Sequence, residues 1–178
     1  KLLCGKPLIQ YTIDQAIASR VFSEIMVSTE DQEIADISKK CGASVPFLRP
    51  MELASDRSPT IDAVVDVLQK YNEQKIRFDA VCILQATNPL RTVNSLKNSI
   101  EKFKQTKADS LISVRKVPHD LNPHWTFEAD KSGFLRIATG EKQIISRRQE
   151  LPDAYYRDGS IYLVRSDIVL NNKSLYGE

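Results

Sequence analysis

Three stretches of the sequence gather side chains that could bind an anionic or polar ligand. The first, residues 49–60, begins with Arg49 and ends with Ser58 and Thr60 at the predicted start of a helix. A helix N-terminus attracts anions through its free backbone N–H groups and its dipole, and a guanidinium adds a fixed positive charge. The stretch therefore predicts a nucleotide contact. A simpler interpretation stays open, in which Ser58 or Thr60 caps the helix and Arg49 pairs with a surface carboxylate.

The second stretch, residues 85–91, follows a nearly continuous apolar run and reads Gln-Ala-Thr-Asn-Pro-Leu-Arg. The side-chain amide of Gln85 can donate to a polar ligand and accept from it at once. Alternatively, the stretch is a structural turn in which Thr87 or Asn88 caps a helix that Pro89 opens. Both interpretations remain open from the residues alone.

The third stretch, residues 147–162, collects arginines and tyrosines around the last apolar run, together with Asp158. Arginine binds a carboxylate or phosphate through a bidentate fork, and tyrosine adds a flat apolar face with a polar tip. A subunit interface has the same composition, and the two roles are compatible. The residues in question are Arg147, Arg148, Arg157, Tyr155, Tyr156 and Tyr162.

Other reactive side chains carry weaker signals. His119 and His124 lack partners at metal-ligand spacing, so we interpret them as loop or interface residues. Lys6 could reach a phosphate or could be a solvated lysine ahead of a helix. The sequence contains no Cys-x-x-Cys, Gly-x-Ser-x-Gly or Gly-Lys-Ser/Thr motif, which argues against covalent catalysis, and no catalytic residue is assigned.

The elements that must position these stretches alternate between strands and helices. Apolar runs predict strands at about 24–28, 43–48, 78–84 and 110–114, and helical periodicity predicts helices between and around them, including 7–19 and 60–71. This alternation predicts an α/β fold with a mostly parallel, Rossmann-like sheet and helices on both faces. Ligands bind such sheets beyond the carboxyl ends of the strands, so we expect Arg49, Gln85 and Tyr162 to converge on one crevice.

The pattern changes after Val114. Residues 115–155 are rich in proline and glycine and predict loops and short strands outside the main sheet, before a last strand at 159–164 and a short helix at 167–170. We therefore predict one domain over residues 1–178 with an inserted arm at about 115–155.

Bulk composition excludes several classes of protein. The 25 Lys and Arg residues nearly balance the 23 Asp and Glu residues, which argues against a nucleic-acid partner. No stretch has the length of apolar sequence that spans a bilayer, so we predict no membrane partner and a cytoplasmic location. The three widely spaced cysteines predict free thiols without a metal site.

Six blocks in the same order along the chain resemble the acylneuraminate cytidylyltransferases, enzymes that activate sialic-acid-like sugars as CMP conjugates. The blocks are Lys6-Pro7-Leu8-Ile9, Ser28-Thr29-Glu30-Asp31, Arg49-Pro50-x-Glu52-Leu53-Ala54-Ser55-Asp56, Leu84-Gln85-x-Thr87-x-Pro89-Leu90-Arg91, Arg148-Gln149-x-Leu151-Pro152 and Gly159-x-Ile161-Tyr162.

The resemblance implies a reaction and a set of site residues. CMP would pass from CTP to the anomeric hydroxyl of a nonulosonic acid, such as N-acetylneuraminate, legionaminic acid or pseudaminic acid, and pyrophosphate would leave with Mg²⁺ as the cofactor. Residues matching Arg49, Ser58 and Thr60 hold the cytidine, and those matching Gln85 and Tyr162 contact the sugar acid. Arg148 would reach a neighbouring subunit's site through the arm in a homodimer, and Asp158 joins this substrate-binding set.

The sequence also departs from the family pattern. The family's first strand and triphosphate loop, and its Mg²⁺-binding aspartates, have no counterpart here, so we expect no metal ligands within this chain and no catalysis by these 178 residues alone. Near Trp125, family members that act on N-acetylneuraminate carry a lysine, which leaves the sugar open. The alternatives are a hexose-1-phosphate or other sugar nucleotidyltransferase and a catalytically silent nucleotide-binding module.

Overall fold

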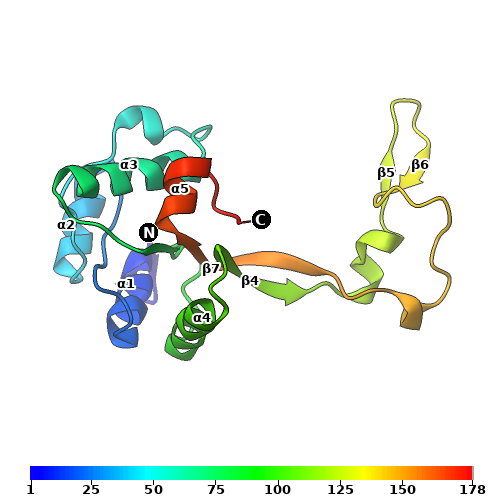
Figure 1. Ribbon diagram of the computed structural model, residues 1–178, viewed down its shortest axis with the longest axis horizontal. Coiled ribbons are helices and arrows are strands. Elements are labelled where there is room, and N and C mark those ends of the chain that lie inside the picture. Colours follow the sequence, from blue (N-terminus) through cyan, green and yellow to red (C-terminus); the bar gives the residue numbers. More distant parts are fainter. Residues whose placement is uncertain (178) are drawn as a thin grey trace. The chain divides into compact units, whose positions relative to one another are not determined.

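The computed structural model describes residues 1–177, which divide into two compact units (Figure 1). We call residues 1–112 with the segment from 159 onward the core unit, and residues 113–158 the arm unit. The sequence predicted a single domain with an arm at about 115–155. No helix in the described chain combines the length and apolarity required to cross a membrane.

The core unit contains the long helices, and local side chains set where two of them begin. The Asp31 carboxylate accepts the backbone N–H groups of Glu33 and Ile34, which starts α2, and the Thr92 hydroxyl accepts that of Ser95 at the start of α4. The helices are α1 (Leu8–Ser19), α2 (Gln32–Lys40), α3 (Thr60–Glu73), α4 (Val93–Thr106) and α5 (Ser166–Asn172), with a short 3-10 helix at Met51–Leu53.

The main sheet has three strands in the order β3, β7, β4. β3 (Ala80–Ile83) pairs antiparallel with β7 (Tyr155–Arg165), and β4 (Ser110–Lys116) lies on the other side of β7. Along the β3–β7 pair, Val81 lies opposite Val164 and Ile83 opposite Tyr162. A small antiparallel pair, β1 (Leu2–Leu3) and β2 (Lys6–Pro7), precedes α1.

The α/β class is confirmed, but the prediction of a mostly parallel sheet is wrong. The β3–β7 pair is antiparallel, and within residues 1–177 parallel pairing is confined to the isolated bridge between Met26 and Ser44. The predicted strands at 24–28 and 43–48 meet only at this bridge. The alternation of helices and strands predicts how consecutive elements connect, but it does not reveal that β7 enters between β3 and β4 in the opposite direction.

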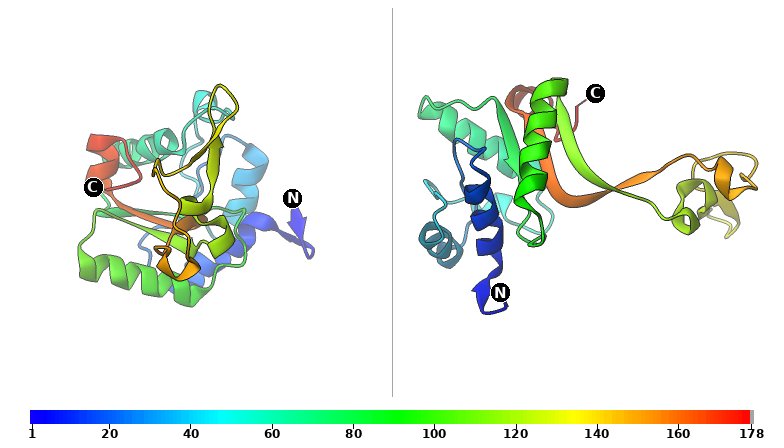
Figure 2. Two further views of the ribbon diagram at one scale, coloured as in Figure 1. Left: turned by 90° about the vertical axis from the view of Figure 1, so that its right-hand side faces the viewer. Right: turned by 90° about the horizontal axis from the view of Figure 1, so that it is seen from below.

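The core lies on both faces of this sheet. Ile161 and Leu163 of β7 pack against Leu96 of α4, whereas Val164 packs against Leu68 of α3 and Val169 of α5. Helices α3 and α5 therefore cover one face and α4 the other, with α1 beside α4 (Figure 2). Each fully buried side chain of this size contributes about 1.5–3 kcal/mol to folding.

The arm unit is built from short elements. β5 (Phe127–Ala129) and β6 (Leu135–Ile137) form an antiparallel hairpin, and the Asp130 carboxylate in its turn accepts the N–H groups of Ser132 and Phe134. These hydrogen bonds, chiefly that from Ser132, hold the pKa of Asp130 below its usual value. The other elements are 3-10 helices at His119–Leu121, Pro123–Trp125 and Arg148–Glu150.

Candidate active site

The tip of β3 is held by a buried arginine. Arg91 is only 5% exposed, and its Nε donates to the carbonyl of Ser160 at 2.8 Å while Nη2 donates to the carbonyl of Gln85 at 3.1 Å. Nη1 donates to Oε1 of Gln15 in α1 at 3.2 Å, and Nε2 of Gln15 donates to the carbonyl of Pro89 at 2.6 Å. One guanidinium thus joins β3, β7 and α1.

The sequence indicates no role for Arg91. An arginine between Leu90 and Thr92 has no local pattern that indicates burial, because the Ser160 carbonyl that it binds lies 69 positions further along the chain. Its burial is therefore a product of the tertiary fold.

The structure places Tyr162, which is 7% exposed, in the β3–β7 strand pair and Gln85 two residues beyond the end of β3. Tyr162 lies opposite Ile83 and alternates with Ile161 and Leu163, so its side chain is on the face covered by α3 and α5. Gly159 has a φ of +74°, and a Cβ placed there would lie 3.0 Å from Oε1 of Gln85. The Gln85 amide therefore sits directly against the backbone of Gly159.

Arg49 belongs to a different cluster of the core unit. Its Nη2 donates to the carbonyl of Ser28 at 2.8 Å and lies 3.3 Å from the carboxylate of Glu30, and its backbone N–H donates to Thr29. The pairing with a carboxylate is therefore present, while Arg49 Nε is buried without an acceptor among the described residues. No hydrogen bond described within residues 1–177 links Arg49 to Gln85 or Tyr162, so their convergence on one crevice stays a prediction.

The alternative capping roles are wrong. Pro59 is the N-cap of α3 and no side chain caps it; Ser58 instead donates to the carbonyl of Glu52 at 2.9 Å, and Thr60 is exposed. Likewise α4 begins at Val93 with Thr92 as its cap, so the turn at 85–91 does not cap this helix through Thr87 or Asn88. Side-chain helix capping therefore does not account for the polar residues of either stretch, although Ser58 has a local partner in the Glu52 carbonyl.

The remaining candidates have partners of their own. In the arm unit, Arg148 Nη2 donates to Nδ1 of His119 at 3.2 Å, and Asp158 accepts the Ser113 hydroxyl at 2.5 Å. In the core unit, Lys6 contacts Asp14 at 2.6 Å, a hydrogen bond that raises the pKa of Lys6. His124 Nδ1 lies 2.7 Å from Glu141, so each of these side chains already has a partner within its own unit.

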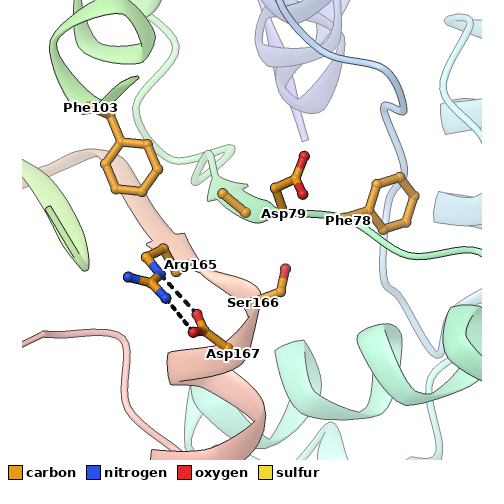
Figure 3. Close-up of a pocket in the computed structure, with 7 residues that line it drawn as sticks. Phe78, Asp79, Phe103, Arg165, Ser166 and Asp167 are labelled. Atoms are coloured by element: carbon orange, nitrogen blue, oxygen red, sulfur yellow. Dashed lines mark hydrogen bonds and ion pairs between the residues drawn. The ribbon is translucent and has the colours of Figure 1, made fainter. Parts of the chain in front are cut away.

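A cavity of about 470 Å³ opens at the other end of the strands, where β3 begins and β7 ends (Figure 3). Arg165 at its rim is paired with Asp167 and Asp109. None of the residues predicted to bind substrate lines it, so we do not assign the reaction to this cavity. Its lining residues are Phe78, Asp79, Ala80, Phe103, Arg165, Ser166 and Asp167.

The described residues do not form a metal site. Within residues 1–177, no group of three or more His, Cys, Asp or Glu side chains lies close enough together to hold an ion. Magnesium, which the resemblance implies, therefore does not fit any donor set described here.

The fold is that of an α/β nucleotidyltransferase. The chain is similar to the structure of a CMP:2-keto-3-deoxy-manno-octonic acid synthetase complexed with CTP, with a TM-score of 0.70 and 16% identity, covering 100% of this chain and 71% of that one. This likeness concerns the fold alone.

Sequence similarity identifies the family. Residues 1–176 match the family described as Cytidylyltransferase, and the chain belongs to this family of nucleotidyltransferases. It is 38% identical to the CMP-N,N'-diacetyllegionaminic acid synthase of Legionella pneumophila, over 100% of this chain and 75% of that protein. It is 32% identical to a pseudaminic acid cytidylyltransferase of Campylobacter jejuni, over 97% of this chain and 73% of that protein.

Proposed function

We propose that the protein to which this chain belongs forms a CMP-nonulosonic acid from CTP and the free sugar acid. The anomeric hydroxyl oxygen of the sugar attacks the α-phosphorus of CTP, and the bond from that phosphorus to the bridging oxygen of the β-phosphate breaks. Pyrophosphate leaves, and the hydroxyl proton passes to solvent. Membership of the cytidylyltransferase family supports this reaction, as do relatives named for legionaminic and pseudaminic acids.

The observation that carries the proposal is that Gln85 and Tyr162 lie near the same end of the β3–β7 pair in a cytidylyltransferase. Tyr162 lies opposite the last residue of β3, and Gln85 follows two residues later, against Gly159. An amide and a phenol together offer donors and acceptors to the hydroxyl, acetamido and carboxylate groups of a nonulosonic acid. Because transfer of a nucleotidyl group depends mainly on positioning and charge neutralisation, the protein needs no covalent nucleophile.

The nucleotide would be held by residues 49–60. Arg49 brings a guanidinium that is only partly neutralised by Glu30 at 3.3 Å, and Ser58 and Thr60 flank Pro59 at the N-terminus of α3. The N–H groups at that helix end attract an anionic ligand. We assign cytidine binding to Arg49, Ser58 and Thr60.

A second copy of the chain would complete the site. The arm unit exposes large apolar side chains, including Phe134 at 73%, which suits a surface buried between subunits. We propose a homodimer in which Arg148 serves the partner's substrate and Asp158 joins the sugar-binding set. Light scattering measures the dimer directly. The exposed apolar residues are Val114, Leu121, Phe127, Phe134, Leu135, Ile144, Tyr155 and Tyr156.

Two further properties stay predictions. Dependence on Mg²⁺ is expected of the reaction, but no step above is assigned to the metal because the described residues provide no site for it. Loss of activity in EDTA and its return with added Mg²⁺ measure this dependence. The cytoplasmic location expected from the sequence is likewise a prediction.

The test is an assay of the enzyme encoded by the intact gene. We expect CTP with N,N'-diacetyllegionaminic acid, pseudaminic acid or N-acetylneuraminate to release pyrophosphate and yield a CMP-sugar detectable by mass spectrometry, with the legionaminic acid as the first substrate to try. ATP, GTP and UTP serve as controls. Turnover of a hexose 1-phosphate, with no product from any nonulosonic acid, would contradict the proposal.

A further inference from the structure

We propose that Arg91, together with Gln15, is the positioning unit that fixes the sugar-binding pair Gln85 and Tyr162. This inference rests on the proposed function, because it assigns a cause to the geometry of that site. Neither residue is expected to touch the substrate, because the Arg91 guanidinium and the Gln15 amide both already bind protein atoms.

The pair of strands β3 and β7 stops just before Gln85. The β3–β7 ladder ends with Ile83 opposite Tyr162, and continuing this register by two residues brings Gln85 opposite Ser160. Arg91 donates to the carbonyls of these same two residues, at 3.1 and 2.8 Å. The guanidinium therefore clamps the strands together where their own ladder ends.

Gln15 links Arg91 to α1. The Gln15 side chain accepts from Arg91 Nη1 at 3.2 Å and donates to the carbonyl of Pro89 at 2.6 Å. The Gln15 amide thus binds both the Arg91 guanidinium and the turn that precedes Arg91. A planar guanidinium can serve such divergent acceptors at once, whereas the ammonium of lysine is a compact point charge.

The space between the Gln85 side chain and Gly159 is narrow. Its Oε1 lies against Gly159, where a Cβ would come within 3.0 Å. A shift of the Gln85 or Ser160 backbone by a fraction of an ångström therefore changes the room available to the very amide that is proposed to bind the sugar. A misplacement of about 1 Å at a reacting site can lower the rate by as much as about 100-fold.

The experiment measures KM for each substrate and kcat in the intact enzyme for Arg91→Lys, Arg91→Met and Gln15→Leu. We expect kcat/KM for the sugar acid to fall by roughly 10- to 100-fold in the Arg91 variants and by less in Gln15→Leu, with KM for CTP unchanged. Guanidinium chloride at millimolar concentration should partly restore an Arg91→Ala variant by occupying the vacated space. A merely structural role would change KM for both substrates alike, whether or not guanidinium restores activity.

Arg165→Met is the matched control, because Arg165 also joins segments of the core unit, through Asp109 and Asp167 at the far end of β7. It should leave KM for the sugar acid within about twofold of the parent enzyme, the level expected of a surface change. If Arg91→Lys and Gln15→Leu fold, as judged by circular dichroism, and also keep the parental KM for the sugar acid, the positioning role is overturned. If Gln85→Ala itself leaves that KM unchanged, the proposed sugar site fails first and the positioning role fails with it.

Discussion

The tip of β3 and the loop of residues 49–60 hold their polar side chains by different means. At the tip, a buried guanidinium donates to two strand carbonyls, and charge-assisted hydrogen bonds of this kind contribute about 1.5–3 kcal/mol each. In the loop, the half-buried Ser58 hydroxyl donates to the Glu52 carbonyl and neighbours the Ser55 hydroxyl, and neutral bonds contribute about 0.5–1.5 kcal/mol. Arg49 also makes a charge-assisted hydrogen bond, to the Ser28 carbonyl, so the weaker contacts of the proposed nucleotide side are those of Ser58.

The largest expected effect concerns cysteine reactivity in β3, the strand that leads to Gln85. Cys82 packs against the cluster of Leu96, Ile161 and Leu163, and burial raises the pKa of its thiol to about 12. At about pH 8 this lowers the thiolate fraction roughly 1,000-fold below that of an ordinary thiol. Labelling with a thiol reagent, read by mass spectrometry, should modify the exposed Cys4 long before Cys82. Equal labelling rates would show that β3 opens readily.

The same shift predicts how stability depends on pH. Because the folded state raises the pKa of Cys82, the neutral thiol stabilises the fold below about pH 9, and this contribution is lost as the pH rises toward about 12. Urea unfolding should therefore show a steeper loss of stability above about pH 9 in the parent than in Cys82→Val. Parallel curves for the two proteins would contradict the burial of this thiol.

An intermediate effect is expected for Arg49 in the loop region. Arg49→Ala should raise KM for CTP by roughly 10- to 100-fold, because a charged hydrogen bond to the nucleotide is lost, and should leave KM for the sugar acid unchanged. The matched control is Glu30→Gln, which removes the carboxylate 3.3 Å from Arg49 and keeps the Arg49 bond to Ser28. Equal changes in the two variants would mean that Arg49 only supports the turn at 28–31.

Several elements predicted from local sequence patterns are confirmed. The helix predicted at 7–19 is α1 at Leu8–Ser19, the helix at 60–71 is α3 at Thr60–Glu73, and the strand at 159–164 lies within β7. Each depends on periodic apolar residues that face one core, which is a property of a short window of sequence.

The sequence did not predict features that depend on contacts between distant segments. The antiparallel entry of β7 depends on how the chain returns after the arm, and the burial of Arg91 depends on Ser160 at a separation of 69 residues. For the site, local patterns together with the family resemblance predict Gln85 and Tyr162 as sugar-binding residues. They could not reveal that Arg91 connects the strands that carry both, because no periodic pattern records a hydrogen bond across strands.

The smallest effect is expected for Ser58→Ala, which tests a neutral hydrogen bond in the loop of residues 49–60. Ser58→Ala removes a hydroxyl that donates to the Glu52 carbonyl at 2.9 Å and lies 2.7 Å from the Ser55 hydroxyl, so the loop loses about 0.5–1.5 kcal/mol of local hydrogen bonding. Water can replace the lost donor at this partly exposed position, and the unfolding temperature should change little. KM for CTP should rise by no more than about tenfold, and KM for the sugar acid should stay constant.

Ser55→Ala is the matched control, since it removes the neighbouring hydroxyl but keeps the bond from Ser58 to Glu52. A rise in KM for the sugar acid in Ser58→Ala would mean that the loop and the tip of β3 act as one unit, and the contrast between the two regions would then be wrong.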